Sequence, residues 1–396
     1  MHEEFRFDYE PGTLVYGEGC VSALGDEVAA IGAEDALVVT GETVGTTPEV
    51  VDPVRAGLGD RLAGVFAETT TAKTLGTAID AAERFHDLDA DALVSLGGGS
   101  SLDVAKVASV LAARNGDDID RAAVHEEFEE TGTLSVPGGE LVPILTVPTT
   151  LAGADLSVVA GITTRTDGLT RGGVSDGRLM PEALYYDPAL FETTPHDVLC
   201  ASAMNGFDKG VETLYAANAT PVTDGTAMRG LRLLSKGLPA LGAGERDEQT
   251  LHDAVVGTML VQYGCSRGSG STLSLIHAFG HGIARGYAVQ QGGAHAIIAP
   301  HALRLLFDRV DGRRDLLAEA LGVDDTDDPA GAVVDRVAEI RDALGLPTRL
   351  REIEDLSKED LPDVAESTHD DSLVGNTPEG FDPSVEDIED VLRSAW

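Results

Sequence analysis

Cysteine, aromatic residues and long apolar runs are all sparse in this sequence of 396 residues. The three cysteines Cys20, Cys200 and Cys265 lie far apart and form no CxxC pair. Such usage excludes a disulfide framework and a thiolate zinc site, and it is typical of a reducing compartment. No apolar run approaches membrane-spanning length, and the N-terminus lacks the basic and apolar segments of a signal peptide. We therefore expect a cytoplasmic protein with no membrane partner.

Positive charge is also scarce, because 28 basic residues, only five of them lysines, face 68 acidic ones and leave a formal net charge of −40. The hydrophobic fraction of 42% is ordinary for a globular protein, so the acids predict an acidic surface on a folded chain. That surface would repel polyanions, which excludes nucleic acid as a main partner. Few lysines, dispersed acids and an aspartate-rich turn at residues 324–328 are interpreted as adaptation to a very salty cytoplasm, that of an extreme halophile.

The order of apolar patterns predicts two domains, which the length allows. In the first half, strands alternate with helices, which is typical of a parallel sheet covered on both faces. The predicted strands are 36–40, 92–96 and 142–147, and the predicted helices are 78–85 and 102–113. From residue 195 onward helical patterns dominate. They fall at 201–216, 222–238, 251–264, 273–284, 295–307 and 384–395. We predict an α/β domain over residues 1–190 and an all-α domain over 191–396, with surface loops or hairpins at 114–140 and 163–178.

Three consecutive glycines, Gly97, Gly98 and Gly99, join a predicted strand to a predicted helix. Glycines allow a pyrophosphate to approach the backbone, and the N-terminus of the next helix offers free N–H groups and a favourable dipole. Ser100 would cap this helix, and Asp103 lies in its first turn. Tight strand-to-helix turns need glycine in many proteins without a ligand, but three in a row favour phosphate binding. The segment therefore predicts a dinucleotide site.

The same segment matches the string GGGSxxDxAK completely, and the sequence here resembles the iron-containing (group III) alcohol dehydrogenase superfamily. A second block, VPTTLAGADLS from residue 147, is closer to the form found in maleylacetate reductases than to that of the metal-dependent alcohol dehydrogenases. The resemblance implies a dehydroquinate synthase-like fold, a homodimer, and NAD or NADP as cofactor. Many NAD-preferring relatives carry an aspartate where this chain has Gly41, so the choice between NAD and NADP stays open. The predicted cofactor-binding residues are Gly41, Gly97, Gly98, Gly99, Ser100, Asp103, Thr149, Thr150, Leu151 and Arg171.

Four positions at which metal-dependent members of the superfamily hold Fe²⁺ or Zn²⁺ correspond here to Asn205, Lys209, His277 and Gln291. An ammonium cannot bind a metal until it loses its proton, and a neutral amide is a weak donor. We therefore predict no catalytic metal, with a metal held through Asp208 or His295 as the alternative.

Lys209 is predicted to take over the role of the metal, because a fixed positive charge can stabilise the oxyanion that develops during hydride transfer. His281, the second histidine of the HxxxH block, is predicted to donate or relay the proton, and His277 and Asn205 complete the predicted catalytic set. The alternatives are a solvent-exposed Lys209 and a paired core His281. Cations that could anchor a dicarboxylate are Lys209, Arg171, Arg267 and Arg285.

The sequence thus predicts an NAD(P)-dependent oxidoreductase that acts on a small carbonyl, alcohol or oxo-carboxylate substrate. Two rival hypotheses remain. One is another enzyme of the same architecture, similar to dehydroquinate synthase or glycerol-1-phosphate dehydrogenase, although the metal and the basic phosphate site of these enzymes are not evident here. The other is an NAD(P)-binding protein that has lost its activity.

Overall fold

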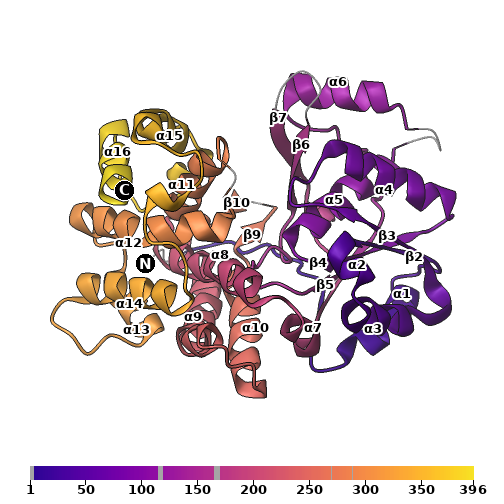
Figure 1. Ribbon diagram of the computed structural model, residues 1–396, viewed down its shortest axis with the longest axis horizontal. Helices are drawn as coiled ribbons and strands as arrows, with labels where there is room; N and C mark the ends of the chain where they lie inside the picture. The colour runs from indigo at the N-terminus through magenta and orange to yellow at the C-terminus, as the bar shows by residue number, and fades with distance from the viewer. Residues whose placement is uncertain (1–3, 115–118, 165–169, 269, 288) are drawn as a thin grey trace. The chain divides into compact units, whose positions relative to one another are not determined.

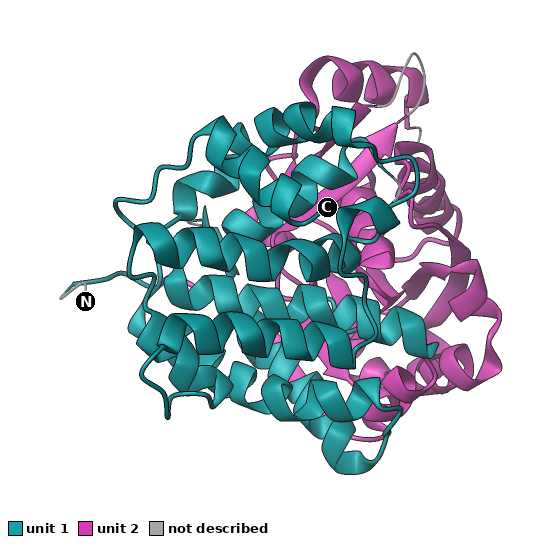
Figure 2. Ribbon diagram, turned by 60° about the vertical axis from the view of Figure 1, so that its left-hand side comes forward, with its two compact units in different colours: residues 1–8, 151–153, 195–396 teal, residues 9–150, 154–194 magenta. Residues whose placement is uncertain are grey.

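The computed structural model describes residues 4–114, 119–164, 170–268, 270–287 and 289–396, and the chain divides into two compact units (Figures 1 and 2). The α/β unit comprises Tyr9–Thr150 and Ala154–Thr194. The helical unit comprises Met1–Asp8, Leu151–Gly153 and Pro195–Trp396. Two short segments from the region predicted as the first domain therefore belong to the helical unit. One of them, Leu151–Gly153, lies next to the candidate site described below.

A parallel sheet forms the centre of the α/β unit, as predicted, but it has six strands in the order β1-β8-β5-β4-β2-β3, of which β1, β3 and β8 were not predicted (Figure 1). Its strands are β1 (Thr13–Tyr16), β2 (Ala36–Gly41), β3 (Leu62–Thr69), β4 (Ala92–Gly97), β5 (Ile144–Pro148) and β8 (Ala183–Tyr186). The helices are α1 (Leu24–Ala30), α2 (Glu42–Thr46), α3 (Pro48–Leu58), α4 (Leu75–Asp87), α5 (Gly99–Ala112), α6 (Arg121–Thr131) and α7 (Pro188–Glu192).

Apolar side chains on both faces of the sheet explain why the strands appear as continuous hydrophobic runs in the sequence. In β2, Leu37 and Val39 join one buried cluster with residues of α4 and α5. Ala36 and Val38 point to the opposite face and join a second cluster with α1 and α3. The sheet is therefore buried between two helical layers.

The segment 114–140, predicted as loop or hairpin, contains helix α6 instead. Asp120 caps this helix by accepting a hydrogen bond from the Ala123 N–H at 3.1 Å. Only Val124 and Phe128 of its 11 residues are buried, so the helical period is weak in the sequence. In the segment 163–178, the predicted excursion includes the antiparallel pair β6 (Val159–Thr164) and β7 (Thr170–Ser175), while residues 165–169 lie outside the described residues.

The helical unit contains the predicted helices with shifted ends, and its described residues also form α13, α14 and α15, which were not predicted. Its helices are α8 (His196–Tyr215), α9 (Pro221–Gly242), α10 (Glu248–Gln262), α11 (Leu275–Ala284), α12 (Gln291–Arg309), α13 (Arg314–Leu321), α14 (Pro329–Ala343), α15 (Leu361–His369) and α16 (Val385–Ser394). Glycine lets α12 approach α8, because a Cβ on Gly292 would lie 1.9 Å from the Ala201 carbonyl oxygen. Within the described chain, every helix falls short of the length or the hydropathy that a membrane-spanning segment requires.

Candidate active site

The predicted glycine turn lies at the carboxyl end of β4 and begins α5. Gly97 has a φ of +127°, which side chains rarely tolerate, and its carbonyl accepts a hydrogen bond from the Thr149 N–H at 3.0 Å. A Cβ on Gly98 would lie 3.2 Å from the Thr150 side chain. The structure therefore brings Gly97, Gly98 and Gly99 together with Thr149 and Thr150 at the ends of two neighbouring strands. The turn precedes a helix of 14 residues, whose N-terminus favours an anion.

The other predicted cofactor residues lie in different elements of the two units. Gly41 ends β2 at the same edge of the sheet, where its missing Cβ would lie 3.3 Å from the Thr69 carbonyl oxygen. The expected cap at Ser100 is wrong, because α5 begins at Gly99 with Gly98 as its N-cap, which also leaves Asp103 beyond the first turn. Arg171 lies in strand β7 of the hairpin. Leu151 belongs to the helical unit, where its N–H donates to Ser202 Oγ at 3.0 Å.

Asp103 forms an ion pair with a lysine that sequence reasoning missed. Lys73 Nζ lies 2.6 Å from Asp103 Oδ2, and both side chains are less than one-third exposed. Lys73 adopts a positive φ of 49° in the turn between β3 and α4, which is uncommon for a residue with a side chain. Nothing in the sequence pairs these residues, which lie 30 positions apart.

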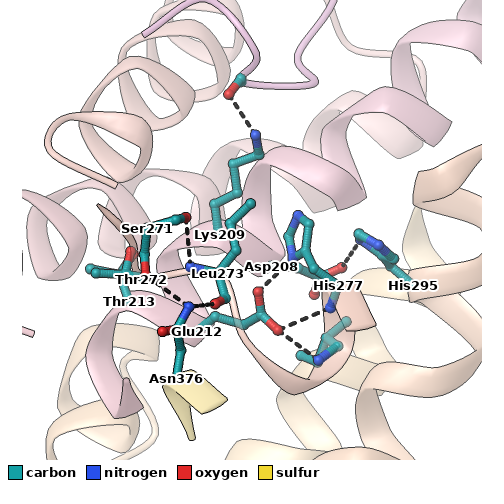
Figure 3. A network of polar contacts seen from close by, with 12 residues as sticks. Asp208, Lys209, Glu212, Thr213, Ser271, Thr272, Leu273, His277, His295 and Asn376 are labelled. Carbon is teal, nitrogen blue, oxygen red and sulfur yellow. Dashed lines mark hydrogen bonds and ion pairs between the residues drawn. The ribbon is translucent and has the colours of Figure 1, made fainter. Parts of the chain in front are cut away.

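In the helical unit, α8 presents Asn205, Lys209 and Glu212 on one face, since they follow the spacing i, i+4, i+7. The Lys209 ammonium donates to the Gly153 carbonyl at 2.8 Å, and Figure 3 shows its side chain extended away from Glu212. The turn that carries Gly153 packs directly on α8, because a Cβ on Gly206 would lie 2.3 Å from the Leu151 carbonyl oxygen. Lys209 is half-buried and held in place, so it is not the solvent-exposed helix residue of the alternative interpretation.

Behind Lys209, the carboxylates of α8 face two buried histidines (Figure 3). His277 Nδ1 lies 2.5 Å from Glu212 Oε2, and His295 Nδ1 lies 3.4 Å from Asp208 Oδ2. The two imidazole rings meet edge to face with centroids 4.3 Å apart. His295 fits against α11 only because residue 280 is glycine, since a Cβ at that position would lie 2.3 Å from His295 Nε2.

Burial controls the charge of this cluster. It lowers the pKa of His277 well below its usual value, and the nearby Lys209 charge lowers it further. Burial likewise lowers the pKa of His295, with the His277 ring as a second cause. Burial raises the pKa of Asp208 far above its usual value, and the Glu212 charge adds to the effect. Burial therefore favours the neutral form of both histidines and of Asp208.

His281 lies half-exposed one turn beyond His277, with its Nδ1 3.1 Å from Asp371 Oδ2. Asp371 is also paired with Arg285 at 3.2 Å and accepts from the Leu373 N–H at 3.0 Å. Burial acts to raise the pKa of Asp371, but the hydrogen bonds from His281 and Leu373 outweigh it and the pKa is lowered. Asp371 is thus a carboxylate that orients the His281 ring. Sequence reasoning missed it because it lies 90 residues away.

Among the cations considered as substrate anchors, Arg285 and Arg267 contact residues of the helical unit, as Lys209 does. Arg285 binds Asp371 and the Ser367 hydroxyl, and Arg267 lies over the Phe7 ring at 5.2 Å.

The residues at the superfamily's metal positions do not fit a metal ion. Lys209 places an ammonium among them, and Asn205 and Gln291 offer neutral amides. Asp208 and His295, the alternative ligands, face each other and do not complete a site. In the described part of the chain, no three His, Cys, Asp or Glu side chains are arranged to hold a metal.

The α/β unit with its glycine turn and the helical unit with its lysine, histidine and carboxylate cluster place the chain among the dehydrogenases and reductases. It belongs to the iron-containing alcohol dehydrogenase family. The family's profiles match residues 11–188 ("Iron-containing alcohol dehydrogenase") and 199–396 ("Fe-containing alcohol dehydrogenase family, C-terminal"). The predicted resemblance and fold are thereby confirmed, and the chain is an oxidoreductase.

Its relatives include reductases of different substrates. It is 29% identical to maleylacetate reductase 1 of Cupriavidus pinatubonensis JMP 134 over 91% of this chain and 90% of that protein. It is 25% identical to lactaldehyde reductase of Escherichia coli K12 over 97% of this chain and 98% of that protein. Among solved structures, sulfoacetaldehyde reductase of Bifidobacterium kashiwanohense in complex with NAD⁺ shares the fold, with a TM-score of 0.85, 19% identity and 99% of both chains covered.

Proposed function

We propose that this protein is an NAD(P)-dependent reductase or dehydrogenase of a small carbonyl or oxo-carboxylate compound, and that it works without a catalytic metal. The observation that carries the proposal is the half-buried Lys209 ammonium, which is held by Gly153 at a position where metal-dependent relatives have a ligand. The glycine turn with its positive φ at Gly97 supports binding of the cofactor pyrophosphate. The similarity to maleylacetate reductases supports a reductase of an oxo-carboxylate.

When bound, the nicotinamide supplies the hydride for reduction or accepts it for oxidation. The role of Lys209 is to stabilise the negative charge that develops on the substrate oxygen during reduction. An ammonium has three N–H donors, and the bond to Gly153 uses one of them. In a partly buried site this charge is screened less than it would be in water, so it favours the transition state over the neutral carbonyl.

His281 is the proposed proton donor. The Nδ1–H of His281 donates a hydrogen bond to Asp371 Oδ2, which orients the ring and leaves Nε2 for the reacting oxygen. A hydride added to the carbonyl carbon and a proton from His281 added to the oxygen together give the alcohol. Oxidation runs through the same groups in reverse.

A substrate panel tests this proposal. We expect oxidation of NADH or NADPH, in concentrated KCl, with maleylacetate or with at least one short aldehyde or ketone. Comparing the two cofactors also decides the preference that Gly41 leaves open. Tight NAD(P)H binding without turnover on any member of the panel would instead identify a cofactor-binding protein that has lost its activity.

A further inference from the structure

The carboxyl group of Glu212 in α8 forms hydrogen bonds with residues of both α8 and α11. Its Oε1 accepts the backbone N–H groups of Ile276 at 2.6 Å and His277 at 3.0 Å, and the Tyr215 hydroxyl at 3.2 Å. Its Oε2 faces His277 Nδ1 at 2.5 Å. The carboxyl group is fully buried. It caps the first turn of α11 and also contacts the side chain of His277, which lies in that turn.

This arrangement determines which nitrogen of His277 carries the proton. Burial raises the pKa of Glu212, but the three donors that converge on Oε1 stabilise the ionised form of its carboxyl group. An ionised carboxylate can only accept, so His277 must donate from Nδ1. Its Nε2 is then unprotonated. This buried atom has no hydrogen-bond partner in the described part of the chain, and a buried acceptor without a partner calls for a functional explanation.

We propose that Glu212 is a positioning residue that holds His277 as the neutral Nδ1–H tautomer, so that Nε2 accepts a hydrogen bond from the hydroxyl of the reduced substrate. The proposal rests on the proposed function and extends it, because it gives His277 a role that needs no metal. His277 orients the substrate oxygen, while Lys209 stabilises its charge. Glu212 does not touch the substrate and acts only through the ring that it orients.

Glu212→Gln is the decisive variant, because the structure fixes which way the amide must point. The two backbone N–H groups and Tyr215 require an acceptor at the Oε1 position, so the amide NH₂ must occupy the Oε2 position and face His277 Nδ1. The ring would then accept at Nδ1 and carry its proton on Nε2. Loss of the correct tautomer without a change of geometry lowers turnover strongly in other histidine-dependent enzymes.

The experiment combines ¹⁵N NMR of the histidine rings with steady-state kinetics. We expect Nδ1–H in the wild-type protein, Nε2–H in Glu212→Gln, and a kcat lowered about tenfold with little change in the Kd of the cofactor. Tyr215→Phe is the matched control, since it removes one donor from Oε1 and leaves Oε2 unchanged. It should keep the wild-type tautomer and most of the turnover.

An Nε2–H tautomer in the wild-type protein, or an unchanged tautomer and kcat in Glu212→Gln, would overturn the proposal. The NMR result does not depend on finding a substrate. Failure of the proposed function therefore appears in the kinetics alone, whereas failure of the positioning role appears in the ring spectrum.

Discussion

Lys209→Ala should lower kcat by about a thousandfold and leave the Kd of NADH or NADPH nearly unchanged. Loss of one donor aimed at a developing oxyanion costs about 10² to 10³ in turnover, and Lys209 contributes a full charge as well as a donor. The cofactor turn lies in the α/β unit and keeps all its contacts in this variant. Steady-state kinetics combined with fluorescence titration of the reduced cofactor would measure both quantities.

Lys236→Ala is the matched control for Lys209→Ala, because Lys236 is an exposed lysine of α9 in the same unit. It should retain full activity. Lys209→Arg keeps the charge but changes the shape of the donor group, so we expect partial activity from it. Normal turnover in a folded Lys209→Ala protein would remove Lys209 from the mechanism.

The second large effect is expected at the glycine turn, where Gly97→Ala should weaken NAD(P)H binding about a hundredfold. A side chain at a φ of +127° costs about 1 to 3 kcal/mol, which the turn can relieve only by changing its conformation. The added Cβ would also lie 3.2 Å from Ser101 Oγ. Backbone N–H groups displaced by that change would no longer point at the pyrophosphate. Isothermal titration calorimetry would give the Kd directly.

Gly138→Ala is the control for this variant, since Gly138 is exposed and a Cβ there would meet nothing within 4 Å. Its cofactor affinity should equal that of the wild type. Equal affinity in Gly97→Ala would show that the cofactor does not depend on this turn.

Sequence patterns predicted part of the sheet, since β2, β4 and β5 were assigned, whereas the equally buried β8 was not. Strand β4 is buried along its whole length, and its apolar run was assigned correctly together with the glycine turn that follows it. The prediction was wrong for α6, which buries only Val124 and Phe128 and therefore gives a weak periodic signal. The place of Leu151–Gly153 in the helical unit was not predictable either, because it depends on the close approach of this turn to Gly206.

Residues of the candidate site that share one helix could be grouped from the sequence. Asn205 and Lys209 were assigned from the resemblance to the iron-containing alcohol dehydrogenases, and Glu212 lies on the same face of α8, one turn beyond Lys209. Asp371 and Lys73 were missed because each meets its partner, His281 or Asp103, through tertiary structure alone. The double role of Glu212 also depends on where α11 begins, which no local pattern reveals.

In the function proposed above, the ammonium of Lys209 takes the place of a metal ion. A metal polarises the substrate oxygen with its charge, and an ammonium supplies charge and hydrogen bonds to the same oxygen. Burial and the Lys209 charge favour the neutral form of His277. Asn205 and Gln291, at two other of the superfamily's metal positions, are amides and add no charge.

The most direct test of this account is NAD(P)H oxidation by protein that has been treated with a strong chelator and analysed for its metal content. We predict that turnover on the best substrate of the panel is unchanged after Fe²⁺ and Zn²⁺ have been removed. Activity that disappears with the chelator and returns when Fe²⁺ or Zn²⁺ is added would contradict the role assigned to Lys209.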